Sequence, residues 1–256
     1  MQRPPSAIIT GAGSGIGRAI ALDLSRAGYS LTLAGRRTEA LNATKSLCPP
    51  TSTTPNIRCA SCDLSNPSAA ESLIDNHVQH FGGLDVLVNN AGLGEVRPLG
   101  QITSDDISRA LNTNALGAAC ATTRAWPIWV AQKSGCLINI ASMAVFDPFP
   151  GFFAYAASKA ALAMMAVSAA KEGAPHNIRA FSICPSAVET EMLRASFSDE
   201  VIPSNACLFP ADVSRFVMQC IRGERDAENG RAIPLLSTAA QPWLDQHRQN
   251  PGLWLR

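Results

Sequence analysis

The sequence predicts one doubly wound α/β domain built on a parallel sheet of about seven strands. Short apolar, β-branched runs alternate with helix-like segments along most of the chain, which is typical of a parallel sheet covered on both faces. No repeat of fixed period and no low-complexity linker interrupts this alternation. The length of 256 residues is sufficient for one such domain, and a domain of this size hides roughly 70–75% of the surface that its unfolded chain exposes.

The expected strands are residues 7–10, 30–34, 56–61, 86–89, 137–140, 180–184 and 232–236. The expected helices are residues 15–27, 38–47, 68–81, 105–130, 155–173 and 211–223. We assign residues 1–240 to the domain and residues 241–256 to a carboxyl-terminal tail. In such a sheet the ligand lies at the carboxyl ends of the strands, so motifs that directly follow a strand carry most weight.

Composition and charge exclude several classes of function. The formal net charge of +1 and a pI near 7.6 give no basic field for nucleic acid. No segment approaches the roughly 18 apolar residues of a spanning helix, and the first residues lack the features of a secretory signal. Eight scattered cysteines include one CxxC pair without further zinc ligands. We therefore expect a cytoplasmic protein with reduced thiols, no metal, and neither a nucleic-acid nor a membrane partner.

A glycine-rich turn follows the first expected strand. Residues 10–17 read TGAGSGIG, and glycines there would let the backbone approach a pyrophosphate at the start of the next helix. The strict GxGxxG spacing fails because Ile16 stands at the third glycine position, so an ordinary structural turn remains an alternative. The candidate cofactor residues in this turn are Gly11, Ser14, Gly15, Ile16 and Gly17.

The end of the second expected strand carries Arg36 and Arg37. An acidic residue at this place would bind the ribose 2′-hydroxyl of NAD, whereas an arginine can bind the 2′-phosphate of NADP. No Asp or Glu occurs between Ser30 and Thr38. This favours NADP(H) over NAD(H) as the cofactor; a solvated arginine pair at a helix start is the alternative.

Several further short motifs follow in order along the chain. NNAG occurs at residues 89–92, and Asn114 stands in an NALG context. Ser142 precedes Tyr155 by thirteen residues, and Tyr155 with Lys159 forms YxxxK. Together with TGxxxGxG at residues 10–17 and the pair Asp63 and Leu64, these motifs resemble the classical short-chain dehydrogenase/reductase family. The resemblance covers about residues 6–236 and implies a Rossmann domain with dinucleotide-dependent reductase activity.

The resemblance implies a role for each matched residue. Tyr155 would exchange the proton of the substrate, Lys159 would lower the pKa of the phenol and hold the nicotinamide ribose, and Ser142 would donate a hydrogen bond to the substrate oxygen. Asn114 would support a proton relay through water. The remaining cofactor contacts implied are Asp63, Leu64, Asn90, Ala91, Gly92, Pro185, Val188 and Thr190. The spacing of Tyr155 and Lys159 alone already places both on one helix face.

The sequence departs from the family pattern in two places. Ser186 stands where the family has a glycine after proline, and the usual ending with paired glycines is replaced by a tail with Trp243 and Trp254. The phenylalanine-rich segment 146–153 either lines an apolar substrate pocket or packs in the core or an interface.

The expected function is reduction of a 3-oxoacyl or similar apolar ketone. A catalytically idle dinucleotide-binding regulator or a structural subunit on the same fold is the alternative. The expected assembly is a homodimer or homotetramer formed through helices 105–130 and 155–173.

Overall fold

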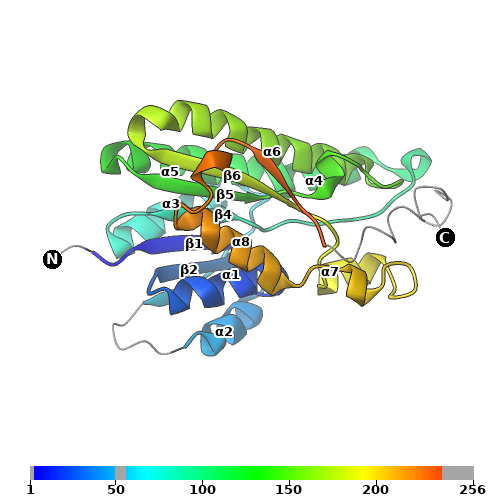
Figure 1. The fold of residues 1–256 in the computed structure, drawn as a ribbon, viewed down its shortest axis with the longest axis horizontal. Helices are drawn as coiled ribbons and strands as arrows, with labels where there is room; N and C mark the ends of the chain where they lie inside the picture. Colours follow the sequence, from blue (N-terminus) through cyan, green and yellow to red (C-terminus); the bar gives the residue numbers. More distant parts are fainter. Residues whose placement is uncertain (1–2, 50–55, 238–256) are drawn as a thin grey trace.

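The sheet of the computed structural model, which describes residues 3–49 and 56–237, has seven parallel strands in the order β3-β2-β1-β4-β5-β6-β7. Figure 1 shows these strands running through the middle of the molecule. Their bounds are β1 Ser6–Thr10, β2 Ser30–Gly35, β3 Ile57–Ser61, β4 Val86–Asn89, β5 Gly135–Ile140, β6 Ile178–Pro185 and β7 Ala232–Leu235. The predicted fold class, a doubly wound parallel sheet of about seven strands, is confirmed. The tail at residues 241–256 lies outside the described residues, so the domain division stays a prediction.

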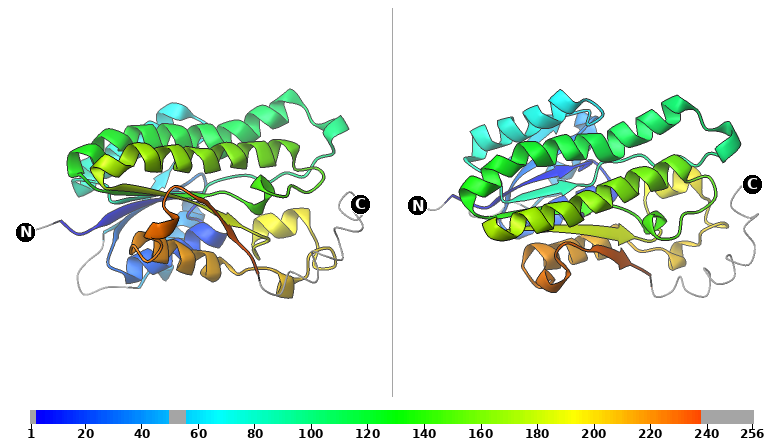
Figure 2. Two further views of the ribbon diagram at one scale, coloured as in Figure 1. Left: turned by 45° about the horizontal axis from the view of Figure 1, so that its top comes forward. Right: turned by 90° about the horizontal axis from the view of Figure 1, so that it is seen from above.

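Helices cover both faces of the sheet. The helices are α1 Gly15–Arg26, α2 Thr38–Leu47, α3 Pro67–Phe81, α4 Ser104–Leu111, α5 Gly117–Gln132, α6 Phe153–Gly173, α7 Glu191–Ser196 and α8 Pro210–Ile221. One face carries α1, α2 and α8, and the other carries α3, α5 and α6, which lie side by side in Figure 2. Short α7 lies beyond the carboxyl ends of the strands (Figure 1).

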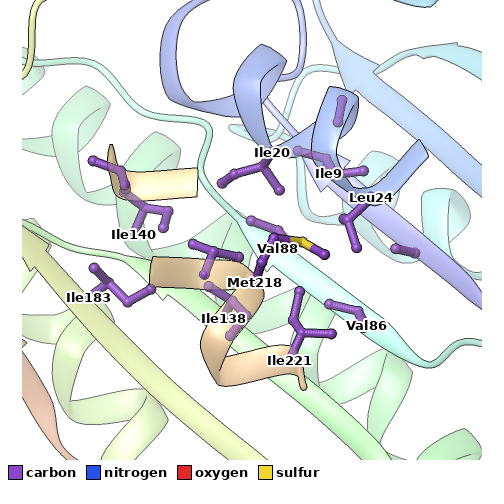
Figure 3. Close-up of a cluster of buried hydrophobic side chains, with 14 of the residues drawn as sticks. Ile9, Ile20, Leu24, Val86, Val88, Ile138, Ile140, Ile183, Met218 and Ile221 are labelled. Atoms are coloured by element: carbon purple, nitrogen blue, oxygen red, sulfur yellow. The ribbon is translucent and has the colours of Figure 1, made fainter. Parts of the chain in front are cut away.

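Two apolar clusters hold these layers together. On the α1 and α8 side, Ile20 and Leu24 meet Met218 and Ile221 above the sheet residue Val88, as Figure 3 shows. On the other side, Trp129 and its neighbours in α5 pack with residues of α3 and α6. Because most sheet residues are buried on both faces, the strands read as continuous apolar runs instead of alternating ones.

The predicted helix at 105–130 is confirmed as one continuous helical segment over residues 104–132, but one turn inside it is π-helical. The structure has α4, then a π-helical turn at Asn112–Leu116, then α5. A π turn places one extra residue in the helical path without ending the helix, so a sequence prediction of helix does not distinguish it from α-helix. A capping box between Thr103 and Asp106 starts α4. The sequence analysis also missed α7, since six residues are too few for a periodic signal.

Helix α6, together with the short turn that follows it, is apolar enough over Phe153–His176 to cross a membrane by length and composition alone. In this fold the helix packs against β5 and β6, and its buried residues include Leu162 and Ala166. The apolar composition and the packing against two strands are features of a core helix in a parallel-sheet protein. Helix α6 also carries Tyr155 and Lys159.

Candidate active site

A cavity of about 620 Å³ opens at the carboxyl ends of the central strands. It collects nearly all candidate residues from the sequence, although they come from loops far apart in the chain. The lining includes Gly11, Ser14, Gly15, Ile16, Arg36, Arg37, Asp63, Leu64, Asn90, Ala91, Gly92, Ser142, Tyr155, Lys159, Pro185, Val188 and Thr190. Two candidates do not line it, namely Gly17 and Asn114.

The glycine turn presents the start of α1 to the cavity. Helix α1 begins at Gly15, and its N-cap Ser14 makes no side-chain capping bond. The first N–H groups of the helix are therefore left for a ligand, as the pyrophosphate of a dinucleotide requires. Gly17 lies behind this surface, where a Cβ would stand 2.3 Å from the Gly11 carbonyl oxygen. The structure thus shows close packing at Gly17, and its contact with a cofactor stays a prediction.

Thr10, which the sequence analysis did not single out, fixes the glycine turn to the end of β4. Its hydroxyl donates to the Val88 carbonyl at 3.1 Å and accepts from the N–H groups of Asn90 and Ala91 at 2.9 and 3.0 Å. The Asn90 side chain donates back to the Thr10 carbonyl at 2.9 Å. The side chain of Asn90 thus joins two loops, and the backbone at Asn90 and Ala91 borders the cavity. The available signal was the threonine that opens the TGxxxGxG pattern at residue 10.

The end of the cavity next to β2 and β3 is bordered by charged side chains. Arg36 and Arg37 follow β2, and Arg37 lies 3.9 Å from Glu191 at the start of α7, with both side chains largely exposed. Asp63 accepts from the backbone N–H and the hydroxyl of Ser65, and these bonds lower the pKa of its carboxyl. Arg36 also lowers that pKa. The described residues at this end thus offer two cations and an ordered carboxylate.

Ser142 follows the carboxyl end of β5, and Tyr155 and Lys159 lie in the first turns of α6; all three line the cavity. The Lys159 ammonium donates to the Ile140 carbonyl at 2.8 Å and lies 5.9 Å from the centre of the Tyr155 ring. Burial lowers the pKa of Lys159 to about 8. Burial also raises the pKa of Tyr155, and a hydrogen bond from Ser142 acts in the opposite direction. In the protein alone, burial is thus the largest influence on both groups.

Asn114 lies fully buried in the π-helical turn, where all its amide groups are bonded. Its Nδ2 donates to the Leu93 carbonyl and the Ser158 hydroxyl at 2.9 Å each, and its Oδ1 accepts from the Leu93 N–H at 2.8 Å. Because Ser158 precedes Lys159, Asn114 connects the loop after β4 to the helix that carries the lysine. A part in a proton relay stays a prediction.

The far end of the cavity is built from the loop after β5 and from α7 with the residues that follow it. Thr190 caps α7 by accepting from the Leu193 N–H at 3.2 Å. Ser186 is accommodated without a left-handed backbone, since Lys133 and Asn177 are the only residues other than glycine with positive φ in ranges 3–49 and 56–237. The lining residues that sequence reasoning missed include Met143, Met192, Leu193, Ser196, Phe197, Ile202 and Ala206. None belongs to a motif, so only the fold identifies them.

Arg194 fastens α7 to the residues around it. Its Nε donates to Glu189 at 2.8 Å, and a second guanidinium nitrogen donates to the Ile202 carbonyl at 2.8 Å. The Arg194 bond lowers the pKa of the Glu189 carboxyl. One guanidinium therefore joins the loop before α7 to the loop after it, and both border the cavity.

Comparisons with known proteins agree with this geometry. Residues 5–201 match the family model of the short-chain dehydrogenases. An uncharacterized oxidoreductase of Staphylococcus aureus is 34% identical over 190 residues, covering 74% of this chain and 80% of the relative. A crystal structure of levodione reductase gives a TM-score of 0.85 at 24% identity, covering 93% of this chain and 98% of that one.

A 7α-hydroxysteroid dehydrogenase, solved with NADH and 7-oxo glycochenodeoxycholic acid, also gives a TM-score of 0.85, at 25% identity over 93% of this chain and 94% of that one. The model match covers well over half of the chain, and the matched segment contains the glycine turn, Ser142, Tyr155 and Lys159. The protein belongs to the short-chain dehydrogenase family and is an oxidoreductase of that family.

Proposed function

We propose that the protein is an NADP-dependent reductase of apolar ketones, either 3-oxoacyl compounds or similar keto substrates. The observation that carries the proposal is the meeting of Tyr155, Lys159 and Ser142 in one cavity with the uncapped start of α1. The bound nicotinamide would supply the hydride. The protein would supply a proton and stabilise the charge that develops on the substrate oxygen.

Each side chain has a distinct part in this reaction. The Ser142 hydroxyl would donate a hydrogen bond to the carbonyl oxygen of the substrate. This bond would become stronger as negative charge grows on that oxygen. The Tyr155 hydroxyl would donate the proton, and a phenol with a pKa near 10 needs a neighbouring cation to do so rapidly. The Lys159 ammonium is the available cation, and its bond to the Ile140 carbonyl supports a fixed position behind the phenol.

The preference for NADP is the finer part of the proposal. Arg36 and Arg37 border the cavity where the adenosine ribose would lie, and a guanidinium binds phosphate through paired hydrogen bonds. The structurally similar 7α-hydroxysteroid dehydrogenase was solved with NADH, which makes cofactor preference the point most in need of measurement. That same protein was solved with an oxo compound, which is consistent with ketone chemistry here.

We also propose a homodimer or homotetramer in the cytoplasm. The outer surface near α5 and α6 exposes Leu111, Leu116 and Met164, the last with 64% of its surface accessible. Apolar side chains grouped on helices suggest burial against a second copy. Light scattering would test this: a 27.0 kDa particle at micromolar concentration would contradict it.

The function itself is tested by following the oxidation of NADPH, and separately of NADH, across a panel of ketones. We expect turnover with apolar ketones and a higher kcat/KM with NADPH. Binding of the dinucleotide without turnover of any ketone or alcohol would contradict the proposal and favour a regulator.

A further inference from the structure

The far end of the cavity is lined by a row of aromatic rings. The rings of Phe149 and Phe152 stack with centres 5.8 Å apart and planes inclined by 28°. Phe152 continues to Tyr155 at 4.9 Å and 50°, and Phe197 meets Phe152 edge-on at 6.0 Å. All four residues line the cavity. The Tyr155 phenol is thus at one end of a row formed with Phe152 and Phe149, and Phe197 lies edge-on beside Phe152.

A tight turn fixes this row. The Phe152 N–H donates to the Phe149 carbonyl at 3.1 Å around Pro150 and Gly151, whose φ is +88°, and this is a type II turn. The turn is anchored because the Arg97 N–H donates to the Gly151 carbonyl at 3.0 Å. A Cβ on Gly151 would lie 2.7 Å from Val96, so the turn is pressed against the loop after β4. The row is therefore held by backbone and not only by side-chain packing.

The charged residues near the aromatic row differ from those at the end of the cavity that contains Arg36 and Arg37. Among the described residues that line the cavity, the cations are Arg36, Arg37 and Lys159, and the first two lie at the end next to β2 and β3. Lys159 is buried and donates to the Ile140 carbonyl. Close to the aromatic residues in sequence, Asp147 and Ser196 also line the cavity. A substrate carboxylate beside the aromatic row would have no cationic partner within the described lining, and desolvation would disfavour it.

We propose that Phe149, Phe152 and Phe197 select an uncharged ketone whose aryl ring is joined to the carbonyl by a short aliphatic link. The inference rests on the proposed function and names the substrate class of the same site. With the carbonyl at Tyr155, the ring lies against the aromatic row. Ring pairs with centres 4.5–7 Å apart attract each other beyond the effect of buried area, so a flat ring is favoured over a saturated ring of similar size.

The experiment compares 4-phenyl-2-butanone with 4-cyclohexyl-2-butanone. The two compounds share the reacting methyl ketone and differ only in a remote ring, and the cyclohexyl ring is the bulkier one. Two quantities are measured: kcat/KM with the reduced cofactor, and the Kd for protein that holds the oxidised cofactor, where hydride transfer to the ketone is impossible. We expect both quantities to favour the phenyl compound by about threefold to tenfold.

Leucine variants locate the preference. Phe149→Leu and Phe152→Leu keep an apolar side chain and remove the ring, so each is expected to bring the ratio of the two ketones close to one. Phe153→Leu is the matched control, because its ring is 54% exposed and lies next to the row in sequence. A 4-phenyl-2-butanone with a carboxylate in the para position is expected to bind at least about tenfold more weakly than the neutral compound.

The outcomes separate this inference from the proposed function. Equal binding of the two ring compounds, or a preference that survives both leucine variants, would overturn the aromatic row as the selecting element. Reduction of both ketones at equal rates would overturn the inference and leave the reductase intact. A phenyl preference in Kd without any turnover would overturn the reductase and leave the inference standing.

Discussion

The two ends of the cavity are built by different means, and the difference shows what each end can tolerate. At the end proposed for the cofactor, the glycine turn and the start of α1 border the cavity, and Thr10 and Asn90 fasten them to β4. At the end proposed for the substrate, side chains from the loop after β5 and from α7 border the cavity, and Arg194 fastens α7. An end built from backbone suits one constant ligand, whereas an end built from side chains can be altered by substitution.

Removal of the Tyr155 hydroxyl should have the largest effect and should separate the two ends. Tyr155→Phe is expected to lower kcat by about 10²–10⁴-fold, the usual contribution of a positioned proton donor, and to leave the Kd for the cofactor nearly unchanged. Lys159→Ala should impair both quantities, and Ser142→Ala should mainly lower kcat. Steady-state kinetics and cofactor titration measure these effects. A Tyr155→Phe variant that keeps more than about a tenth of the activity would rule out the mechanism.

The folded protein should lose stability in acid because of His77, which lies toward the amino ends of β1 and β2, away from the cavity. This buried ring bonds Thr32 at 2.8 Å and Ser6 at 3.1 Å, and burial is the main cause that lowers its pKa to about 3. Between pH 6.5 and about 3, the imidazole of His77 binds a proton in the unfolded chain but not in the folded protein. Stability from this group is therefore complete above pH 6.5 and is lost as the pH falls, by on the order of 3 kcal/mol at pH 4.

Urea unfolding of the wild type and of His77→Gln from pH 7 to pH 4 measures this loss. The variant should start less stable at pH 7 because its packing and hydrogen bonds are altered, but its free energy of unfolding should fall less steeply with acid. Parallel curves for the two proteins would show that His77 does not carry the effect.

Arg36→Asp should alter the cofactor end alone. Replacing the guanidinium by a carboxylate would remove the proposed hydrogen bonds to the 2′-phosphate, which are worth about 1.5–3 kcal/mol with a charged partner. It would also place an acceptor for the 2′-hydroxyl of NADH. The ratio of kcat/KM between NADPH and NADH should fall at least tenfold, by about 1.4 kcal/mol or more. The ranking of ketones should not change. A wild-type enzyme that prefers NADH would contradict the assignment of Arg36.

Arg194→Met should produce the smallest effect, confined to the substrate end. Without the guanidinium, α7 loses its bonds to Glu189 and to the Ile202 carbonyl. We expect KM for the ketone to rise by roughly threefold to tenfold, with little change in kcat. A rise of roughly threefold to tenfold corresponds to about 1 kcal/mol of binding free energy, which is the usual contribution of a hydrogen bond. Arg215→Met is the control, since Arg215 pairs with Asp212 on the exposed surface of α8. An equal rise in KM for both variants would contradict a positioning role for Arg194.

The contrast between the two ends of the cavity also explains how much of the site could be predicted from the sequence. Strands and the glycine turn follow from local rules, so β4 at Val86–Asn89 and α2 at Thr38–Leu47 match their predicted bounds. Arg36, Asp63 and Tyr155 follow strands or start helices, and the topology brings them to one cavity. Met192, Phe197 and Ile202 could not be predicted, because their position depends on the fold of α7 across the cavity and on the ion pair of Arg194. Asn114 was found by context, but its buried bonds to Leu93 and Ser158 were not.

The order of the strands also has a consequence for synthesis of the chain. Strand β1 occupies the inside of the sheet and pairs with β2 on one side and β4 on the other. By the time β4 has left the ribosome, the chain already carries β1, β2 and β3, so the nucleotide-binding half can assemble while the rest is still being made. The segments that border the ketone emerge later, and β7 at the edge of the sheet closes last. The glycine turn can therefore be held between β1 and β4 early in synthesis, whereas the cavity is completed only when Tyr155, Lys159 and Thr190 have been made.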